Sequence, residues 1–237
     1  MKNVALCILN KNEGSNLVNL INNIDFSEFG WVFAVDGQSI DSSIEVLNRN
    51  EVYTIVQEKR GRGYAIKLAI ESAVSKDPKI DYLVLISSDG NEDPNDLYKI
   101  VELLPNYDLV IASRMLKDSW NEEDANFFKP RKYANNIFSY IAYFLLKSKN
   151  TTYITDPLNG LRGFSLKFVK SLELVSNEYA IEYEMSIKSY IHGSKVKEFP
   201  TIEHERHSGK SMVPPVKTVL QLLKILVEVL RLKNAKR

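Results

Sequence analysis

The sequence lacks several features that mark common classes of protein. It has one cysteine, Cys7, and three histidines in 237 residues. One cysteine excludes an internal disulfide framework, and its place in an apolar run predicts a buried, unreactive side chain. The 31 lysines and arginines nearly balance the 30 aspartates and glutamates, which leaves a net charge of +1. The chain therefore lacks the basic surface that holds nucleic acid, and we expect no nucleic-acid partner.

Long apolar runs are also missing. No stretch of about 18 uncharged apolar residues occurs, so we expect no transmembrane helix. The first apolar run, 4–9, is too short for the core of a signal peptide. With 44% hydrophobic residues, the chain can still bury a large core. We therefore expect a cytoplasmic protein, either in solution or peripheral on the inner face of the membrane.

Apolar strands alternate with helical patterns through the first half. This alternation is typical of a parallel sheet whose right-handed crossovers place helices on both faces. The prediction is an α/β protein with a Rossmann-like, mostly parallel sheet. Strands are expected at 4–9, 31–35, 52–56, 82–86 and 109–112, with a helix after each of the first four.

The second half is less regular. We divide the chain into a main domain, 1–212, with a nucleotide-binding half (1–115) and an acceptor half (116–212), followed by an amphipathic helix and basic tail (213–237). The elements expected after residue 115 are a polar loop at 117–132, an aromatic helix at 133–147, a turn-rich segment at 156–164, a helix at 178–190, a strand at 195–199 and a long helix from about 216 to 232.

Polar clusters follow the expected strands at one end only. In parallel sheets, ligands bind beyond the carboxyl ends of the strands. A random scatter would place polar clusters at both ends, so this arrangement predicts one ligand site. The clusters are Asn12 with Glu13, then Asp36, Arg60 with Arg62, Asp89 with Asn91, and Arg114.

Asp89 and Asn91 follow the most apolar strand and lie two residues apart. Their oxygens can reach one hard cation such as Mg²⁺ or Mn²⁺. The alternative is a capping turn, because Asp93 and Pro94 start a helix well by themselves. The polar clusters at the other strand ends favour the metal site.

The segment 203–211 contains two histidines three residues apart, His204 and His207. This is not the metalloprotease spacing, so zinc is not expected. Arg206, Lys210 and Ser211 fit an anion clamp better.

The final helix carries Lys217, Lys224 and Arg231 on one side, and most of its other residues are apolar. Three contacts are open for it: the protein core, a second subunit in a homodimer, or an anionic membrane surface. The basic tail suits the membrane.

An ordered set of segments resembles the inverting family 2 glycosyltransferases of the GT-A fold, especially the dolichol- or polyprenyl-phosphate sugar synthases. The segments are Asn-Glu-Gly at 12–14, Val-Asp-Gly-Gln-Ser-Ile-Asp at 35–41, Asp-Gly-Asn-Glu-Asp-Pro at 89–94, Asp-Pro-Leu-Asn-Gly-Leu-Arg at 156–162, Glu-Phe-Pro at 198–200, and Arg206 with Gly-Lys-Ser at 209–211.

The resemblance implies a metal-dependent transfer of a hexose from a UDP- or GDP-sugar to a polyprenyl phosphate or a glycan. The resemblance implies nucleoside contacts by Glu13 and Asp36, metal binding by Asp89 and Asn91, closure over the donor diphosphate and acceptor phosphate by Arg206 and Ser211, and acceptor binding by Arg114, Arg131 and Arg162. From the residues themselves we also assign nucleotide binding to Asn12, Arg62 and Asp89, and catalysis to Asp156, Arg206 and Lys210.

The chain departs from the family pattern at two places. Ser87 stands where the first Asp of the Asp-x-Asp motif is expected, so the site has lost a carboxylate. Leu9 and Lys11 replace the usual Pro and Tyr beside the base.

We expect an in-line displacement that inverts the anomeric carbon, with Asp156 as general base if the acceptor is a sugar hydroxyl. Three functions stay open: a transferase that makes a polyprenyl-phosphate sugar, a soluble transferase that acts on a saccharide or protein, and a weakened nucleotide-sugar-binding protein.

Overall fold

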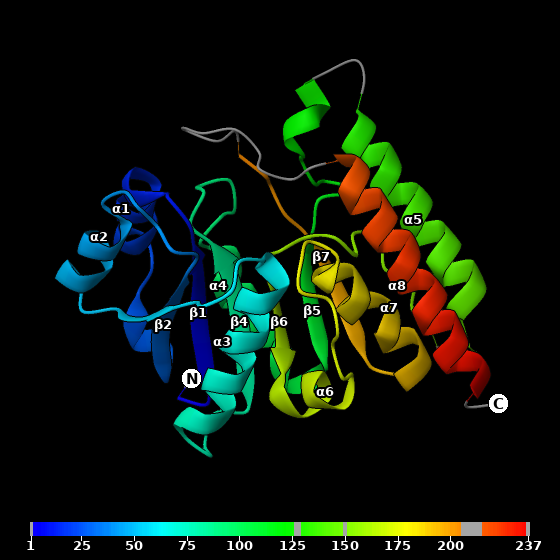
Figure 1. Cartoon of the computed structure of the whole chain (residues 1–237), viewed down its shortest axis with the longest axis horizontal. Coiled ribbons are helices and arrows are strands. Elements are labelled where there is room, and N and C mark those ends of the chain that lie inside the picture. Colours follow the sequence, from blue (N-terminus) through cyan, green and yellow to red (C-terminus); the bar gives the residue numbers. More distant parts are fainter. Residues whose placement is uncertain (1, 126–128, 149–150, 205–214, 236–237) are drawn as a thin grey trace.

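The computed structural model describes residues 2–125, 129–148, 151–204 and 215–235 (Figure 1). One sheet has the strand order β3-β2-β1-β4-β6-β5-β7. Its strands are β1 (Val4–Asn10), β2 (Trp31–Asp36), β3 (Tyr53–Val56), β4 (Tyr82–Ser87), β5 (Leu109–Ser113), β6 (Arg162–Ser165) and β7 (Val196–Pro200). The α-helices are α1 (Gly14–Asn22), α2 (Ser43–Arg49), α3 (Arg62–Lys76), α4 (Asp96–Leu103), α5 (Pro130–Leu146), α6 (Leu166–Ser171), α7 (Ile181–His192) and α8 (Pro215–Ala235).

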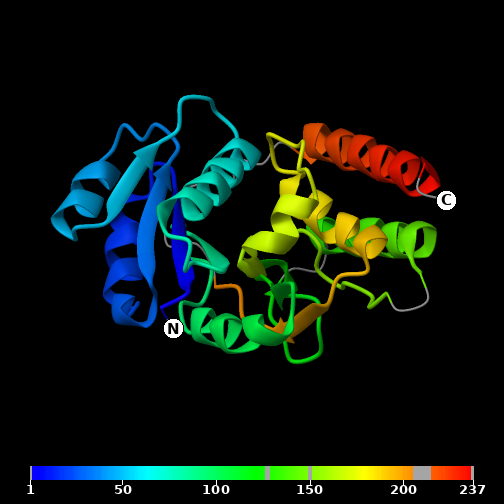
Figure 2. The same ribbon diagram turned by 90° about the horizontal axis from the view of Figure 1, so that it is seen from below.

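Both faces of the sheet are covered (Figure 2). Along β1, Cys7 and Leu9 belong to a core cluster shared with α3, α5, α6, α7 and α8. Leu6 and Ile8 point to the opposite cluster, which is shared with α1, α2 and α4. A strand that is buried on both faces must be apolar at every position, which explains its unbroken hydrophobic run. Burial raises the pKa of the Cys7 thiol, as an unreactive core residue requires.

The sheet is mostly parallel, as the sequence predicts, but β6 was missed. It pairs antiparallel with both β4 and β5, inside the segment expected to consist of turns. A strand that reads Arg-Gly-Phe-Ser has no apolar alternation to reveal it. Gly163 is required there by packing, because a Cβ would lie 2.4 Å from Ile100 Cγ2 on α4. Because β6 runs antiparallel, residues 156–161 enter it at the carboxyl edge of the parallel strands.

Helix α8 packs against α7 and lies beside α5 (Figure 1). Leu222, Ile225, Leu226 and Val229 are buried in the core. The helix is therefore part of the folded body, which is one of the contacts left open by its sequence. Its other side is exposed and carries Leu220, Leu223 and Val227. Within the described ranges, no helix combines the length and apolar character that crossing a bilayer needs.

Two leucines of α8 give a matched test of this packing. Leu226 is 5% exposed and Leu220 is 62% exposed. We expect Leu226→Ala to lower the free energy of unfolding by about 2–4 kcal/mol, because it removes buried side-chain atoms and leaves a cavity. Leu220→Ala should stay within about 0.5 kcal/mol of the wild type. Urea unfolding measures both, and equal effects would contradict the observed packing.

Candidate functional site

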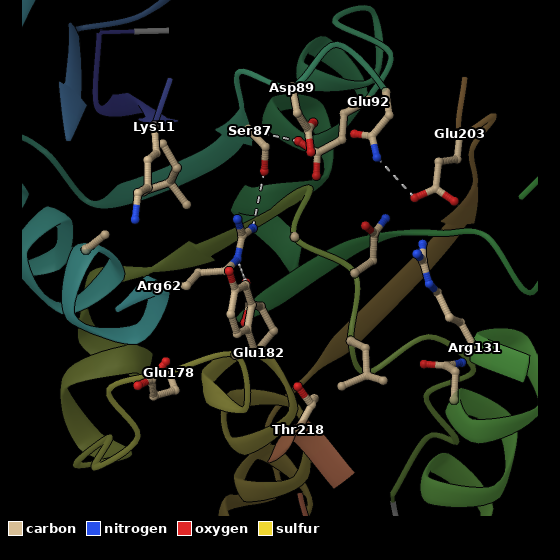
Figure 3. A pocket seen from close by; sticks show the side chains of 18 of the residues that line it. Lys11, Arg62, Ser87, Asp89, Glu92, Arg131, Glu178, Glu182, Glu203 and Thr218 are labelled. Carbon is tan, nitrogen blue, oxygen red and sulfur yellow. Dashed lines mark hydrogen bonds and ion pairs between the residues drawn. The ribbon is translucent and has the colours of Figure 1, made fainter. Parts of the chain in front are cut away.

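A cavity of about 820 Å³ lies along the carboxyl edge of the sheet. Its volume falls within the usual range for small-molecule sites. The wall begins at the ends of β1 and β2, with Lys11 and Gly37, and passes the end of β4 at Ser87 and Asp89. It ends at Arg131, in the first turn of α5, and at the start of α8. Figure 3 shows Lys11 and Arg131 on opposite sides of the site.

The β1–β2 end of the cavity is shaped by polar residues that lie behind its surface. Asp36 is fully buried and accepts hydrogen bonds from Asn10 Nδ2 (2.7 Å) and from Ser39 N (2.8 Å). Asn12 Oδ1 accepts a hydrogen bond from the amide of Ile40 (2.8 Å). Neither Asn12 nor Asp36 lines the cavity, whereas Glu13 does. In this structure Asn12 and Asp36 hold the loops, and Glu13 faces the space.

Arg62 projects into the middle of the cavity from the first residue of α3. It forms an ion pair with Glu182 on α7, and its Nη2 donates to Ser87 Oγ (3.2 Å). Burial alone would lower the pKa of Arg62. The negative charges of Glu182 and nearby carboxylates outweigh this effect and raise the pKa above its usual value, so the guanidinium stays charged. Before it, Gly61 has φ 133°, and a Cβ there would lie 2.2 Å from the Asn177 carbonyl oxygen. Only glycine lets the loop approach so closely.

Two carboxylates that follow β4, Asp89 and Glu92, face the cavity, as does Glu203, which follows β7. Glu92 Oε2 accepts a hydrogen bond from the Ser87 amide (2.6 Å), and Asn91 Nδ2 donates to Glu203 Oε1 (3.4 Å). Burial and the charge of Asp89 raise the pKa of Glu92 to about 7. Glu203 is paired with Arg114, and the carboxylate oxygens of Asp89 and Glu92 are donors of the kind that suit a hard cation.

The described residues contain no ready-made group of three His, Cys, Asp or Glu ligands for a metal. Magnesium often needs no such group, because one or two protein oxygens and the substrate phosphates complete its coordination. The hard oxygen donors of Asp89 and Asn91 fit that kind of site.

Arg114 joins two acidic residues at the α5 end of the cavity. Its Nε and Nη2 donate to Asp156 Oδ2 (2.7 Å) and Oδ1 (3.0 Å), and its Nη1 donates to Glu203 Oε1 (2.9 Å). Burial opposes its charge, but Asp156 and Glu203 raise the pKa of Arg114 well above its usual value. Asp156 is fully buried and does not line the cavity. Here Asp156 orients Arg114, and its carboxylate is not placed to take a proton from a ligand.

Comparison with known proteins decides what kind of site this is. Residues 6–170 match the family model described as glycosyl transferase family 2. The chain belongs to this family. It is a glycosyltransferase that uses a nucleotide-sugar donor.

Several known proteins are similar to most of the chain. An uncharacterised protein, MJ1222, of Methanocaldococcus jannaschii is 28% identical, over 90% of this chain and 87% of its own. Glycosyltransferase AglJ of Haloferax volcanii is 25% identical, over 86% of this chain and 65% of its own. A UDP-N-acetylglucosamine–dolichyl-phosphate N-acetylglucosaminyltransferase of Methanococcus voltae is 26% identical, over 72% of each chain.

Solved structures confirm the predicted GT-A fold. Glucosyl-3-phosphoglycerate synthase from Mycobacterium tuberculosis, in complex with UDP, superposes with a TM-score of 0.72 at 15% identity. The match covers 96% of this chain and 79% of that one. Another structure of the same synthase, with Mn²⁺ and UDP, gives a TM-score of 0.67 at 14% identity, over 97% of this chain and 79% of that one.

The structure brings together six of the expected site residues, which all line the cavity: Glu13, Arg62, Asp89, Asn91, Arg114 and Arg131. Three more, Arg206, Lys210 and Ser211, lie outside the described residues.

Arg162 was expected on the acceptor side of this family 2 site, but it is fully buried and does not line the cavity. Its guanidinium donates to the carbonyl oxygens of Asn159 (2.8 Å from Nε), Pro157 (3.1 Å) and Glu182 (2.9 Å). Burial lowers the pKa of Arg162 to about 10, despite the nearby charges of Glu182 and Asp156. The side chain supports the floor of the site and does not reach a ligand in this structure.

The sequence did not single out Glu92, Gly160, Glu182 and Glu203 as site residues. Glu92 lies within a segment already assigned to the metal site and to a helix cap. Gly160 belongs to the approach to the missed strand β6, and Glu182 lies on α7, far from any strand end. The sheet order places β6 between β4 and β5, and this brings Gly160 beside the end of β4.

Proposed function

We propose that this glycosyltransferase moves a sugar from its nucleotide-sugar donor to a polyprenyl phosphate. One observation carries the proposal: an exposed apolar surface begins at the acceptor end of the cavity and continues along two neighbouring helices. The M. voltae relative, whose name includes dolichyl phosphate as acceptor, supports the same class of acceptor.

Helix α5 supplies half of this surface. Ile137, Tyr140 and Phe144 lie three or four residues apart and are 56%, 64% and 63% exposed. Monomeric soluble proteins rarely expose aromatic side chains in a continuous stripe. On α8, Leu220, Leu223 and Val227 form a second exposed stripe. The two helices run side by side, as Figures 1 and 2 both show.

Basic residues border the apolar stripe of α8. Lys217, Lys224 and Arg231 recur every seven residues, and all three are exposed. Apolar side chains beside lysines and arginines are typical of helices that lie on anionic membranes. We call this surface the membrane face. It consists of Ile137, Tyr140 and Phe144 on α5 and of Lys217, Leu220, Leu223, Lys224, Val227 and Arg231 on α8.

The cavity meets the membrane face at the first turns of both helices. Arg131, Lys132 and Ala134 of α5 line it, as do Val219 and Leu222 of α8. A polyprenyl chain lying along the membrane face would bring its phosphate to Arg131 and Arg114. Arginine suits this contact because its guanidinium can bind phosphate oxygens in pairs.

A phosphate acceptor also fits the acid–base chemistry. One of its oxygens is already an anionic nucleophile, so no residue must remove a proton from it. It attacks the anomeric carbon, the bond from that carbon to the nucleoside diphosphate breaks, and the configuration inverts. Arg62, Arg206 and Lys210 would stabilise the negative charge on the departing diphosphate. Asp89 and Asn91 would hold Mg²⁺ or Mn²⁺, which supplies further positive charge there.

Substitutions on the membrane face test the proposal. We expect the double variant Tyr140→Ser with Phe144→Ser to lose at least about 10-fold of the wild-type affinity for vesicles that contain anionic lipid, because it removes about 200 Å² or more of apolar contact. Transfer to a long-chain polyprenyl phosphate should fall with it. Transfer to a short, water-soluble prenyl phosphate should be unchanged, since the cavity is untouched. Co-sedimentation and a sugar-transfer assay measure these effects.

Val56→Ser provides the control, because Val56 is 53% exposed on the edge strand β3, away from α5 and α8. It should behave as the wild type in every assay. If the double variant and the wild type bind vesicles and use long-chain acceptor equally well, the polyprenyl proposal is wrong. Transfer to a free saccharide or protein instead would then favour a soluble transferase.

A further inference from the structure

Helix α7 carries a buried ion pair that does not line the cavity. Lys188 Nζ lies 2.7 Å from Glu184 Oε1, and both side chains are buried. We call these two residues the α7 pair. Buried ion pairs contribute little to stability, because the cost of removing two charges from water offsets their attraction. Stability alone therefore does not explain the α7 pair, and its other contacts show what it holds.

The α7 pair binds the backbone of the loop 173–177, which lies between α6 and α7 and has no regular secondary structure. Glu184 supplies two of the contacts. Its Oε1 accepts a hydrogen bond from the amide of Val175 (2.9 Å), and its Oε2 accepts one from the amide of Ser176 (2.8 Å). An irregular loop cannot pair its own amides as a helix or sheet does, so a carboxylate beneath it takes that place.

Lys188 holds the start of the same loop. Its Nζ donates to the carbonyl oxygen of Glu173 (2.8 Å). Glu173 has φ 49°, in the left-handed region that residues with a side chain rarely adopt. Contacts from outside the loop must therefore stabilise this conformation. The α7 pair supplies one at Glu173 and two more at the following residues.

The loop 173–177 packs directly against the start of α3. The carbonyl oxygen of Asn177 accepts a hydrogen bond from the amide of Tyr64 (3.2 Å). A Cβ added to Gly63 would lie 2.5 Å from a carbonyl oxygen of the loop, that of Ser176. The two backbones are in contact, so a shift of the loop would also move the first turn of α3.

These contacts fix the backbone from which Arg62 projects into the cavity. Arg62 lies between Gly61 and Gly63, and both glycines approach the backbone of the loop 173–177. Misplacing a group by about 1 Å can cost a large factor in rate. We infer that the α7 pair positions Arg62 for the diphosphate of the nucleotide-sugar donor, acting through this loop. The inference rests on the diphosphate role proposed above for Arg62 and on no property of the acceptor.

Removing both charges of the α7 pair tests the inference in the absence of acceptor. The double variant Glu184→Gln with Lys188→Met leaves no unpaired buried charge. It offers one accepting oxygen to two loop amides, so the loop is held less firmly. Isothermal titration with Mn²⁺ present would use UDP and GDP and follow the one that the wild type binds more tightly. We expect the double variant to bind it about 5-fold more weakly, a part of what losing a charged hydrogen bond costs.

A variant of Arg62 shows whether the α7 pair acts through this residue. Arg62→Gln removes the positive charge but can still donate a hydrogen bond to Glu182. It should weaken nucleotide binding at least about 10-fold. When the α7 double variant is added to Arg62→Gln, the further loss should be less than about 2-fold, because the effects of coupled residues do not add. A pair that acted only on overall stability would weaken binding equally in both backgrounds.

Tyr183→Phe is the matched control on the same helix. Tyr183 is fully buried, and its hydroxyl donates to the carbonyl oxygen of Phe138 on α5 (3.2 Å). The substitution removes one buried hydrogen bond and should lower the midpoint of thermal unfolding, whereas nucleotide binding should stay within about 2-fold of the wild type. If the α7 double variant does not fold, Lys188→Met alone gives a milder form of the same test, because it keeps both bonds made by Glu184.

Wild-type affinity in the folded α7 variant would overturn the inference, as would an equal loss in the wild-type and Arg62→Gln backgrounds or an equal loss in Tyr183→Phe. Wild-type affinity of Arg62→Gln would contradict the diphosphate role proposed for Arg62, and the inference would fall with it. Because no acceptor is present, these results are independent of whether polyprenyl phosphate is the acceptor.

Discussion

Asp89→Asn should reduce sugar transfer at least about 100-fold, in line with the cost of losing one group that stabilises a transition state electrostatically. Asp89 is the first carboxylate beyond β4, at the centre of the cavity, and Ser87 two residues before it has none. Metal affinity would therefore depend strongly on this one side chain. The loss should appear in kcat and in binding of Mn²⁺, which can be measured by electron paramagnetic resonance without any acceptor.

Asp93→Asn is the control for this variant. Asp93 lies in the same loop, but its Oδ1 accepts hydrogen bonds only locally, from Asn95 N (2.9 Å) and Nδ2 (3.0 Å), and the residue does not line the cavity. Its substitution should leave transfer within about 3-fold of the wild type, as for a residue away from the chemistry. Transfer by Asp89→Asn at the wild-type rate would contradict the assignment of Asp89 to the metal.

Arg162→Leu should lower the free energy of unfolding by about 3–5 kcal/mol, the usual cost of breaking a buried charged network. The substitution removes both guanidinium donors of the buried Asn159 carbonyl, and one donor each from the carbonyls of Pro157 and Glu182, which Ser186 Oγ also reaches. Buried acceptors without donors are costly. Urea unfolding followed by circular dichroism measures the loss. The prediction separates a structural role from the acceptor-binding role first expected for this arginine.

Arg49→Leu provides a comparison on the surface. Arg49 pairs with Glu45 one turn away on α2, and its side chain is 73% exposed. Exposed pairs of this kind contribute about 0.5 kcal/mol or less. If Arg162→Leu is as stable as Arg49→Leu, and transfer to acceptor is lost, the side chain acts on the ligand and the structural interpretation is wrong.

The sequence predicts the parallel half of this fold well, because strands buried on both faces must be apolar throughout. β1, β2 and β4 show that rule, and the polar residues after them mark the ligand edge. The antiparallel strand β6 does not follow this rule. Arg162 donates to carbonyl groups that only the folded chain brings near, and Gly163 must lack a side chain because Ile100 packs against it.

The candidate site was predictable only where polar residues directly follow a buried parallel strand, because the carboxyl ends of such strands share one edge of the sheet. Asp89 and Asn91 are such residues, since β4 lies beside β1. Asp156 was chosen as a base from its segment, but its two oxygens are bound by Arg114. Glu92, Gly160 and Glu182 come from three elements far apart in the chain, so no local pattern identifies their meeting.

Transfer of label from a nucleotide sugar to polyprenyl phosphate tests the central claim most directly. The purified protein would be incubated with radiolabelled UDP- and GDP-sugars, Mn²⁺, and vesicles that contain anionic lipid and polyprenyl phosphate. We predict that one donor yields labelled lipid that partitions into organic solvent, that EDTA abolishes the product, and that Asp89→Asn does not form it. Label that stays in water-soluble products for every donor, with active protein shown by donor turnover, would contradict the account.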